Sequence, residues 1–291
     1  MDEKDKIPQF ICINGDIIPD IPPALDIYNR SFNFGDGFCE EMRTRGNKII
    51  FFDDHWNNIK KAMSILKMNP DFLPQKNEFE SIVNRLINRN RTLIKSSVLR
   101  LNIFRKTGTS YNDISDQIEY SITAQSLDTS IFTLQPKGVL ININTDFQKN
   151  YSLISEIRTN SAVQKVLALI KAKENRANDA LFLNQNNHLV EFTNSNLFIV
   201  KDNTIITPPL SDGCFDGVMR KKIIEIATET NFKTILVQSI AVTDLYKSSE
   251  IWLVDSVFGI QWVMGYRNQR YFNKVAQKMI EMVNKKAGIQ K

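Results

Sequence analysis

Four basic side chains in the stretch 154–175, ISEIRTNSAVQKVLALIKAKEN, could take part in chemistry: Arg158, Lys165, Lys171 and Lys173. A lysine amine in its neutral form adds to an aldehyde and afterwards acts as a base. A guanidinium has a pKa above about 12, remains protonated and is a poor nucleophile. Arg158 therefore suits a charged contact to a phosphate or carboxylate, whereas the lysines suit covalent chemistry.

A predicted helix determines where these lysines point. Apolar residues recur at helical spacing near 160–175 and form a stripe of Val163, Val166, Leu167 and Ile170. Lys165 projects from the opposite face, and Lys171 and Lys173 flank the stripe, so we expect all three lysines to be solvated. Arg158 precedes this helix and is the basic residue of the stretch that bears on function.

Other patterns predict the elements that surround this stretch. Alternating or β-branched runs predict strands, among them QFICIN, SVLRLNIF, QIEYSITA, VLININT, NDALFLN, HLVEFTNSNLFIV, KTILVQS and EIWLVD. Helices are predicted over 53–68, 77–90, 217–230 and from about 272, with Asp53 as the cap of the first. The segment SFNFGDGFCEEMR is expected to be extended around its glycine pair.

The order of these elements indicates the domain organisation. Hairpins are mixed with helices, which favours an α+β architecture over a doubly wound parallel sheet. The composition changes over 126–138, where Pro136 and Gly138 occur, and this segment is read as a linker. We therefore expect an N-terminal domain over 1–125 and a C-terminal domain over 139–291.

The composition narrows the classes of protein and site. No apolar run approaches the roughly 18 residues of a membrane-spanning helix. Three scattered cysteines, Cys12, Cys39 and Cys214, are typical of a reducing cytoplasm, where we expect the protein to be located. Two histidines, His55 and His188, are too few for a His-based centre, so no metal site is expected.

The net charge of +5 raises the question of nucleic-acid binding. Seven basic residues and no acid occur from Arg85 to Lys106, and such a patch could contact phosphates. No recognised nucleic-acid-binding module accompanies it. The stretch also reads as a solvated helix end followed by a strand with outward-pointing alternate residues, so nucleic acid is not an expected partner.

Three ordered segments carry a resemblance to a known family. They are FGDGFCEEMR (34–43) followed by IIFF and His55, NDALFLNQNNHLVEFTNSNLFIV (178–200), and TPPLSDGCFDGVMR (207–220). In order and spacing they resemble the fold-type IV pyridoxal-phosphate enzymes: branched-chain aminotransferases, D-amino acid aminotransferases and 4-amino-4-deoxychorismate lyases. The resemblance extends from about residue 9 to 285. It implies a two-domain α+β fold, pyridoxal phosphate as cofactor, and a homodimer with active sites near the subunit interface.

The resemblance also implies roles for individual residues. Glu191 matches the glutamate that hydrogen-bonds the pyridine nitrogen and keeps it protonated. Gly217, Val218 and Met219 open a helix whose backbone N–H groups bind the cofactor phosphate, joined by the hydroxyl of Ser256. Thr193, Asn194 and Ser195 would line the cofactor cleft. Without the resemblance, Glu191 reads as a surface strand acid, and His55 reads as a capping or packing residue of its helix.

Two anchors of the family pattern are replaced. Counting back from Glu191 without a gap places the Schiff-base lysine at position 158, where the residue is Arg158. The family's phosphate-binding arginine follows the histidine by three positions, and here that position is Asn58. An arginine–phosphate fork is among the stronger charge-assisted contacts, so a neutral amide there should weaken retention of the cofactor.

The sequence therefore predicts a class IV aminotransferase-family protein with impaired catalysis. It would be a pseudoenzyme that binds a small anion or an amino acid, with covalent attachment of pyridoxal phosphate in doubt. Arg158 would then supply positive charge to an anionic ligand. The alternative is an active pyridoxal-phosphate-dependent aminotransferase or aminodeoxychorismate lyase with an atypical site.

Overall fold

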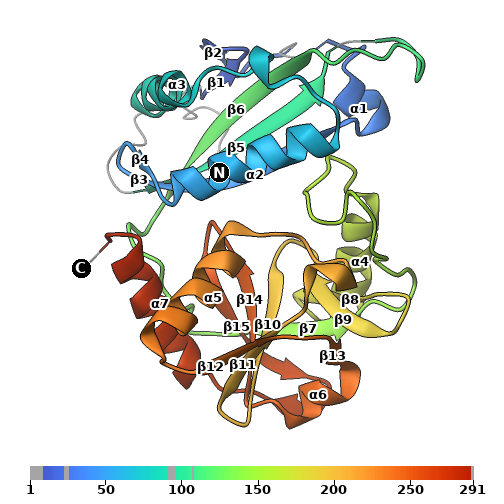
Figure 1. The fold of residues 1–291 in the computed structure, drawn as a ribbon, viewed down its shortest axis with the longest axis vertical. Helices are drawn as coiled ribbons and strands as arrows, with labels where there is room; N and C mark the ends of the chain where they lie inside the picture. Colours follow the sequence, from blue (N-terminus) through green and yellow to red (C-terminus); the bar gives the residue numbers. More distant parts are fainter. Residues whose placement is uncertain (1–8, 23–25, 91–95, 107, 290–291) are drawn as a thin grey trace. The chain divides into compact units, whose positions relative to one another are not determined.

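A computed structural model describes residues 9–22, 26–90, 96–106 and 108–289, whose elements are drawn in Figure 1. The chain divides into two compact units. The N-terminal unit consists of Met1–Ser130 and Arg158–Ser161, and the C-terminal unit consists of Ile131–Ile157 and Ala162–Lys291. Each unit combines sheet and helices, which confirms the predicted α+β class.

The N-terminal unit is built on an antiparallel sheet with the strand order β2-β1-β6-β5-β3-β4. Its strands are β1 (Phe10–Ile13), β2 (Asp16–Pro19), β3 (Gly37–Arg45), β4 (Lys48–Ile49), β5 (Ser96–Arg105) and β6 (Ile118–Leu127). Helix α2 (Phe52–Ile65) contacts β3, and helix α3 (Lys76–Arg89) contacts β1 and β6. The two helices contact each other through stacked and tilted rings of Phe52, Trp56 and Phe79. Arg91 and Lys95 of the basic stretch lie outside the described residues.

Two local predictions in this unit are wrong because of helix capping. The segment expected to be extended begins with the short helix α1 (Arg30–Phe34). The side chain of Asn29 accepts the N–H of Phe32 at 3.1 Å, and Gly35 ends the helix with a left-handed φ of 66°. Asp53 does not cap α2, which begins one residue earlier. The carboxylate of Asp53 lies in the first turn of α2, where its negative charge interacts favourably with the positive end of the helix dipole.

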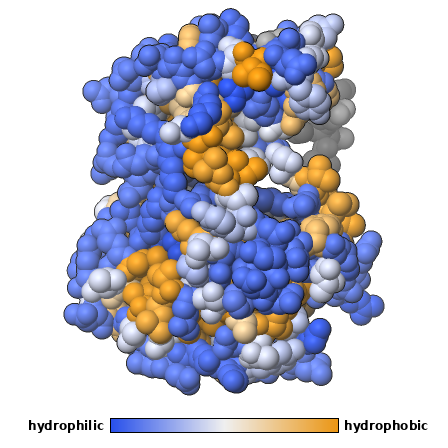
Figure 2. Space-filling model, turned by 45° about the vertical axis from the view of Figure 1, so that its right-hand side comes forward, coloured by the Kyte–Doolittle hydropathy of each residue, from blue (hydrophilic) through white to orange (hydrophobic). Residues whose placement is uncertain are grey.

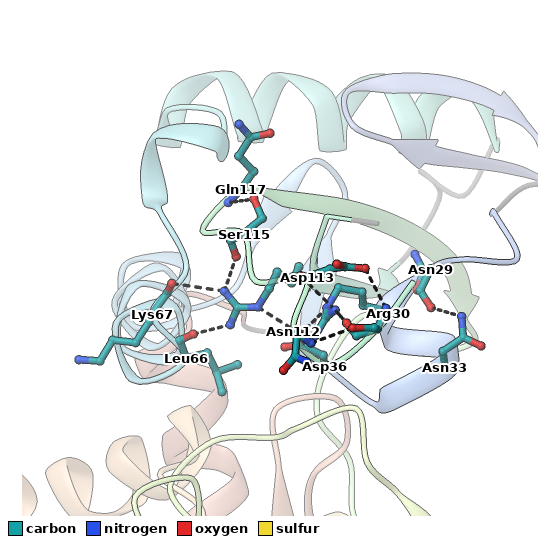
Figure 3. Close-up of polar contacts among 12 residues, drawn as sticks. Asn29, Arg30, Asn33, Asp36, Leu66, Lys67, Asn112, Asp113, Ser115 and Gln117 are labelled. Carbon is teal, nitrogen blue, oxygen red and sulfur yellow. Dashed lines mark hydrogen bonds and ion pairs between the residues drawn. The ribbon is translucent and has the colours of Figure 1, made fainter. Parts of the chain in front are cut away.

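A polar network ties α1 to the segment after β5 (Figure 3). Asp36 accepts hydrogen bonds from Nε of Arg30 at 2.9 Å and from Nε of Arg105 at 3.1 Å. Arg30 also donates a hydrogen bond to the carbonyl of Ser110 at 2.7 Å, and Arg105 donates one to the carbonyl of Leu66 at 2.7 Å. Because both guanidinium groups are largely buried, the shared carboxylate compensates their charge.

The C-terminal unit contains a larger mixed sheet, and antiparallel and parallel pairings both occur in it. Its strands are β7 (Val139–Ile143), β8 (Asp179–Leu183), β9 (His188–Phe192), β10 (Asn196–Lys201), β11 (Thr204–Thr207), β12 (Thr234–Val237), β13 (Ile240–Ala241), β14 (Glu250–Asp255), β15 (Gly259–Tyr266) and β16 (Gln269–Arg270). Glu191 pairs with Asn196 in register, which joins the path β10-β14-β15-β7-β8-β9 into a ring. Leu181, Leu189 and Phe192 belong to the core inside this unit.

The helices of this unit are α4 (Val163–Glu174), α5 (Val218–Thr230), α6 (Val242–Lys247) and α7 (Lys274–Lys286). Helix α5 contacts α7 and β14, and α6 packs against β10 and β13. None of the helices among the described residues is long and apolar enough to cross a membrane.

Helix α4 is oriented differently from what its apolar stripe suggests. It buries the small side chains of Ala168 and Ala172 in a cluster with Phe182, and its apolar stripe is solvent-exposed. Val163 is 68% exposed, and the other three stripe residues are about half exposed. Lys173 is exposed as expected, but Lys165 and Lys171 are half-buried. Hydrophobic side chains also gather in patches on the largely hydrophilic face drawn in Figure 2.

A buried carboxylate joins the start of α7 to the sheet and gives a testable stability prediction. Glu250 accepts the N–H groups of Val275 at 2.7 Å and Ala276 at 3.0 Å, and the indole N–H of Trp252 at 2.9 Å. Glu250→Ala leaves three donors without their acceptor and should lower the free energy of unfolding by about 3 kcal/mol. Urea titration followed by circular dichroism measures this.

The control for this prediction is Glu281→Ala, which removes an exposed carboxylate from the same helix. It should change the free energy of unfolding by less than about 0.5 kcal/mol. If the two variants had equal stability, the N–H groups at the start of α7 would not depend on Glu250.

Candidate functional site

Position 158 is fixed in the N-terminal unit by backbone pairing with β3. The carbonyl of Arg158 accepts the N–H of Cys39 at 2.9 Å, and Asn160 donates its N–H to the carbonyl of Gly37 at 3.0 Å. A Cβ at Gly37 would approach the carbonyl of Ile103 to 2.5 Å, so the close strand packing requires glycine there. Residues 158–160 therefore form an additional edge of this unit's sheet.

The side chain of Arg158 makes an ion pair inside this unit. Its Nη1 donates to Oε2 of Glu41 at 2.9 Å, and the two side chains are 7% and 10% exposed. Arg100 donates to the other oxygen of Glu41 at 2.6 Å, and this hydrogen bond holds the pKa of Arg100 above its ordinary value. Glu41 thus lies between two guanidinium groups, and neither of them is a nucleophile.

Asn58, at the position where the resemblance places a phosphate-binding arginine, is a half-buried residue of α2. One turn before it, the ring of His55 is buried and its Nδ1 lies 2.5 Å from Oε1 of Glu40. His55 therefore packs and pairs within its own unit. Asn58 and Arg158 both belong to the N-terminal unit, whereas Glu191 and the other predicted cofactor-binding residues belong to the C-terminal unit.

Glu191 is a buried acceptor of the C-terminal unit. Its side chain is 3% exposed and lies on β9 at the position that pairs with β10. Oε2 accepts the N–H of Phe215 at 2.7 Å, and Oε1 lies 2.5 Å from Nζ of Lys149. The carboxylate is therefore engaged on both oxygens, and its charge is compensated by a lysine that lies far from it in sequence.

The polar turn between β9 and β10 holds the next three predicted residues. The hydroxyl of Thr193 donates to Oδ1 of Asp179 at 2.7 Å, and burial raises the pKa of that carboxyl despite the bond. Asn194 is exposed. Ser195 is buried and donates its hydroxyl to Oδ2 of Asp255 at 3.3 Å.

Ser256 is placed by the same carboxylate. Oδ1 of Asp255 accepts the N–H groups of Val257 at 2.8 Å and Phe258 at 2.7 Å, which fixes the turn after β14. Ser256 lies inside this turn and is half-buried. Asp255 thus connects Ser195 and the turn of Ser256, two of the hydroxyl groups expected to contact an anionic ligand.

Gly217 is the N-cap residue of α5, and no side chain caps the N–H groups of the first turn. Unpaired N–H groups at a helix start attract anions. A Cβ at Gly217 would lie 2.3 Å from Oδ1 of Asn196, so any other residue there would have to displace the Asn196 amide. Val218 and Met219 follow with buried side chains. Asn196 also donates Nδ2 to the carbonyl of Phe215 at 2.7 Å, which links this loop to the Glu191 strand pair.

The structure thus places Glu191 on β9 and Ser195, Gly217 and Ser256 on turns of the same unit, and it adds Lys149. Sequence reasoning missed Lys149 because it lies in the irregular segment after β7, where neither periodicity nor a motif marks a lysine. Among the described residues, no group of three or more His, Cys, Asp or Glu side chains could hold a metal ion.

Cys214, in the loop that leads to Gly217, offers a test of this local packing. Its thiol is buried beside the carbonyl groups of Pro208 and Pro209, and burial raises its pKa to about 12. About one such thiol in ten thousand is ionised at pH 8, so iodoacetamide should leave Cys214 unmodified in the folded protein. Peptide mass spectrometry should detect modification in urea. Rapid modification without urea would contradict the buried loop.

Comparisons with known proteins identify the family of this chain. The sequence model of the amino-transferase class IV family matches residues 37–264. The aminodeoxychorismate lyase of Vibrio harveyi is 25% identical over 81% of this chain and 85% of its own length.

Solved structures resemble the whole fold. The branched-chain aminotransferase of Thermoproteus uzoniensis, solved with norvaline, has a TM-score of 0.86 at 20% identity, covering 98% of this chain and 96% of its own. The branched-chain aminotransferase of Thermobaculum terrenum in its PLP-form has a TM-score of 0.81 at 17% identity, covering 97% and 95%. The family match covers most of the chain, and the fold agrees with it: this protein belongs to the class IV aminotransferases.

Proposed function

We propose that this chain is a class IV family member that binds a small anion or an amino acid without a covalent bond to pyridoxal phosphate. The observation that carries the proposal is the chemistry of position 158. Its guanidinium is bonded to the buried carboxylate of Glu41, and such a group does not form a Schiff base. Asn58 in place of a phosphate-binding arginine supports the same conclusion.

The residues fit only part of a pyridoxal phosphate molecule. The start of α5 offers backbone N–H groups after Gly217, and Ser195 and Ser256 add hydroxyls, which suits a phosphate or carboxylate. The ring nitrogen would need Glu191, whose carboxylate is bonded to Lys149 and to the N–H of Phe215. The chain therefore lacks two contacts that a covalently attached cofactor needs: an amine at position 158, and a free carboxylate oxygen of Glu191 for the ring nitrogen. What these residues do is orient an anion.

A second candidate is an active pyridoxal-phosphate-dependent aminotransferase or aminodeoxychorismate lyase with an atypical site. The observation in its favour is Lys149, an amine in the same unit as Glu191 and the α5 start. However, the ring nitrogen and the aldehyde lie on opposite sides of the pyridine ring. The amine of Lys149 is bonded to Glu191 and so lies where the ring nitrogen would bind, away from the aldehyde. For this reason we favour the non-covalent function.

The proposal includes a homodimer and a cytoplasmic location. The exposed stripe of α4 supports the dimer, because soluble monomers rarely expose a continuous apolar helix face, and a second copy of the chain would cover it. The thiols of Cys12, Cys39 and Cys214 form no disulfide, which fits a reducing compartment.

Incubation with pyridoxal phosphate tests the function directly. The unaltered protein should show no visible aldimine absorbance and no aminotransferase activity above background. Arg158→Lys, Asn58→Arg and Lys149→Met together supply an amine and a cation at the two replaced anchors and free Glu191 for the ring nitrogen, so this triple variant should regain aldimine absorbance. The matched control is Arg158→Met with Asn58→Arg and Lys149→Met, which should stay colourless. Aldimine absorbance in the unaltered protein would overturn the proposal and favour the second candidate.

Light scattering tests the dimer. The protein should have the mass of two chains, and Val166→Glu with Leu167→Glu should convert it to single chains because charges replace the centre of the stripe. Lys173→Glu changes an exposed residue of the same helix outside the stripe and should leave the dimer intact. A dimer that survives the double substitution would show that α4 is not the contact surface.

A further inference from the structure

Lys149 is held in place at both ends. Its backbone N–H donates to the carbonyl of Leu183 at 2.8 Å, and its ammonium lies beside Glu191 and the carbonyl of Ser155, at 3.5 Å from the latter. The lysine side chain is 21% exposed, so the ion pair is mostly shielded from water. A second hydrogen bond joins the segment after Lys149 to the loop before α5: Asp216 donates its N–H to the carbonyl of Glu156 at 3.1 Å.

This arrangement decides what Glu191 can accept. A ligand with a protonated ring nitrogen would have to donate to a carboxylate that already holds an ammonium and a backbone N–H. The two cations would repel each other in a site of low dielectric constant, where such repulsion is stronger than in water. Displacing Lys149 would instead leave its ammonium without its partner, which is costly for a largely buried ion pair.

We propose that Lys149 is a specificity-determining residue of the anion site, resting on the function proposed above. It neutralises Glu191 and thereby excludes phosphorylated ligands with a cationic aromatic nitrogen. Phosphorylated small molecules whose remaining part is neutral or anionic meet no such repulsion, and they are the class of ligand that the site takes. Discrimination here works through an unfavourable contact with the wrong ligand.

Pyridoxamine phosphate is the appropriate probe because it carries the ring nitrogen and the phosphate but no aldehyde. Its binding is therefore independent of any Schiff base. Isothermal titration calorimetry gives its affinity and that of inorganic phosphate for each variant. The ratio of the two affinities isolates recognition of the ring from recognition of the phosphate.

Lys149→Met should raise this ratio at least tenfold, because Glu191 is then available to a protonated ring nitrogen. Lys149→Arg keeps the positive charge and should leave the ratio unchanged. Glu191→Gln added to Lys149→Met should abolish the gain. Circular dichroism checks folding, and Lys149→Gln, which keeps a hydrogen-bond donor without charge, replaces Lys149→Met if that variant does not fold.

Two results would overturn the inference. One is an unchanged ratio in both uncharged variants, which includes the case in which no variant binds pyridoxamine phosphate. The other is an unaltered protein that already prefers pyridoxamine phosphate as strongly as Lys149→Met. Neither result requires aldimine formation, so the inference and the proposed function fail by different measurements.

Discussion

A carboxylate that is removed from water needs positive charge or hydrogen-bond donors nearby, and the position of Glu191 depends on this constraint. It lies on β9 where the strand ring of the C-terminal unit closes, and its side chain is 3% exposed. The chain itself supplies the partners, Lys149 and the N–H of Phe215. These contacts hold the segment after β7 and the loop before α5 against β9. The loop that ends at Gly217 owes its position partly to this ion pair.

The N-terminal unit solves a similar problem in a similar way. Glu41 is buried on β3 and lies between Arg158 and Arg100. In both units a carboxylate from the sheet is compensated by a basic residue from an irregular segment. Both buried carboxylates thus have their negative charge compensated by contacts within their own unit.

The sequence predicted much of this architecture because its patterns are local or repetitive. Strand alternation located β5, β6, β9 and β10, and the Gly217 signal located the start of α5. The ordered segments identified the class IV family, which the family match confirms. Helix α1 was missed because a single cap, the Asn29 side chain, decides it against the extended reading of the segment.

Long-range contacts escaped prediction for a physical reason. Periodicity reports that α4 has an apolar face, but it does not report what covers that face, and Ala168 and Ala172 are the residues buried. The pairing of Lys149 with Glu191 joins residues 42 positions apart and depends on sheet register that no spacing rule encodes. Counting residues back from Glu191 pointed to Arg158, but its hydrogen bond to Glu41 could be found only in the folded structure.

The most direct test of the account is a crystal structure of the unaltered protein grown with pyridoxal phosphate. The account predicts no covalent bond between the protein and the aldehyde carbon, no pyridine ring beside Glu191, and Lys149 still bonded to Glu191. Continuous density from a lysine amine to the cofactor, with Glu191 turned to the ring nitrogen, would contradict it.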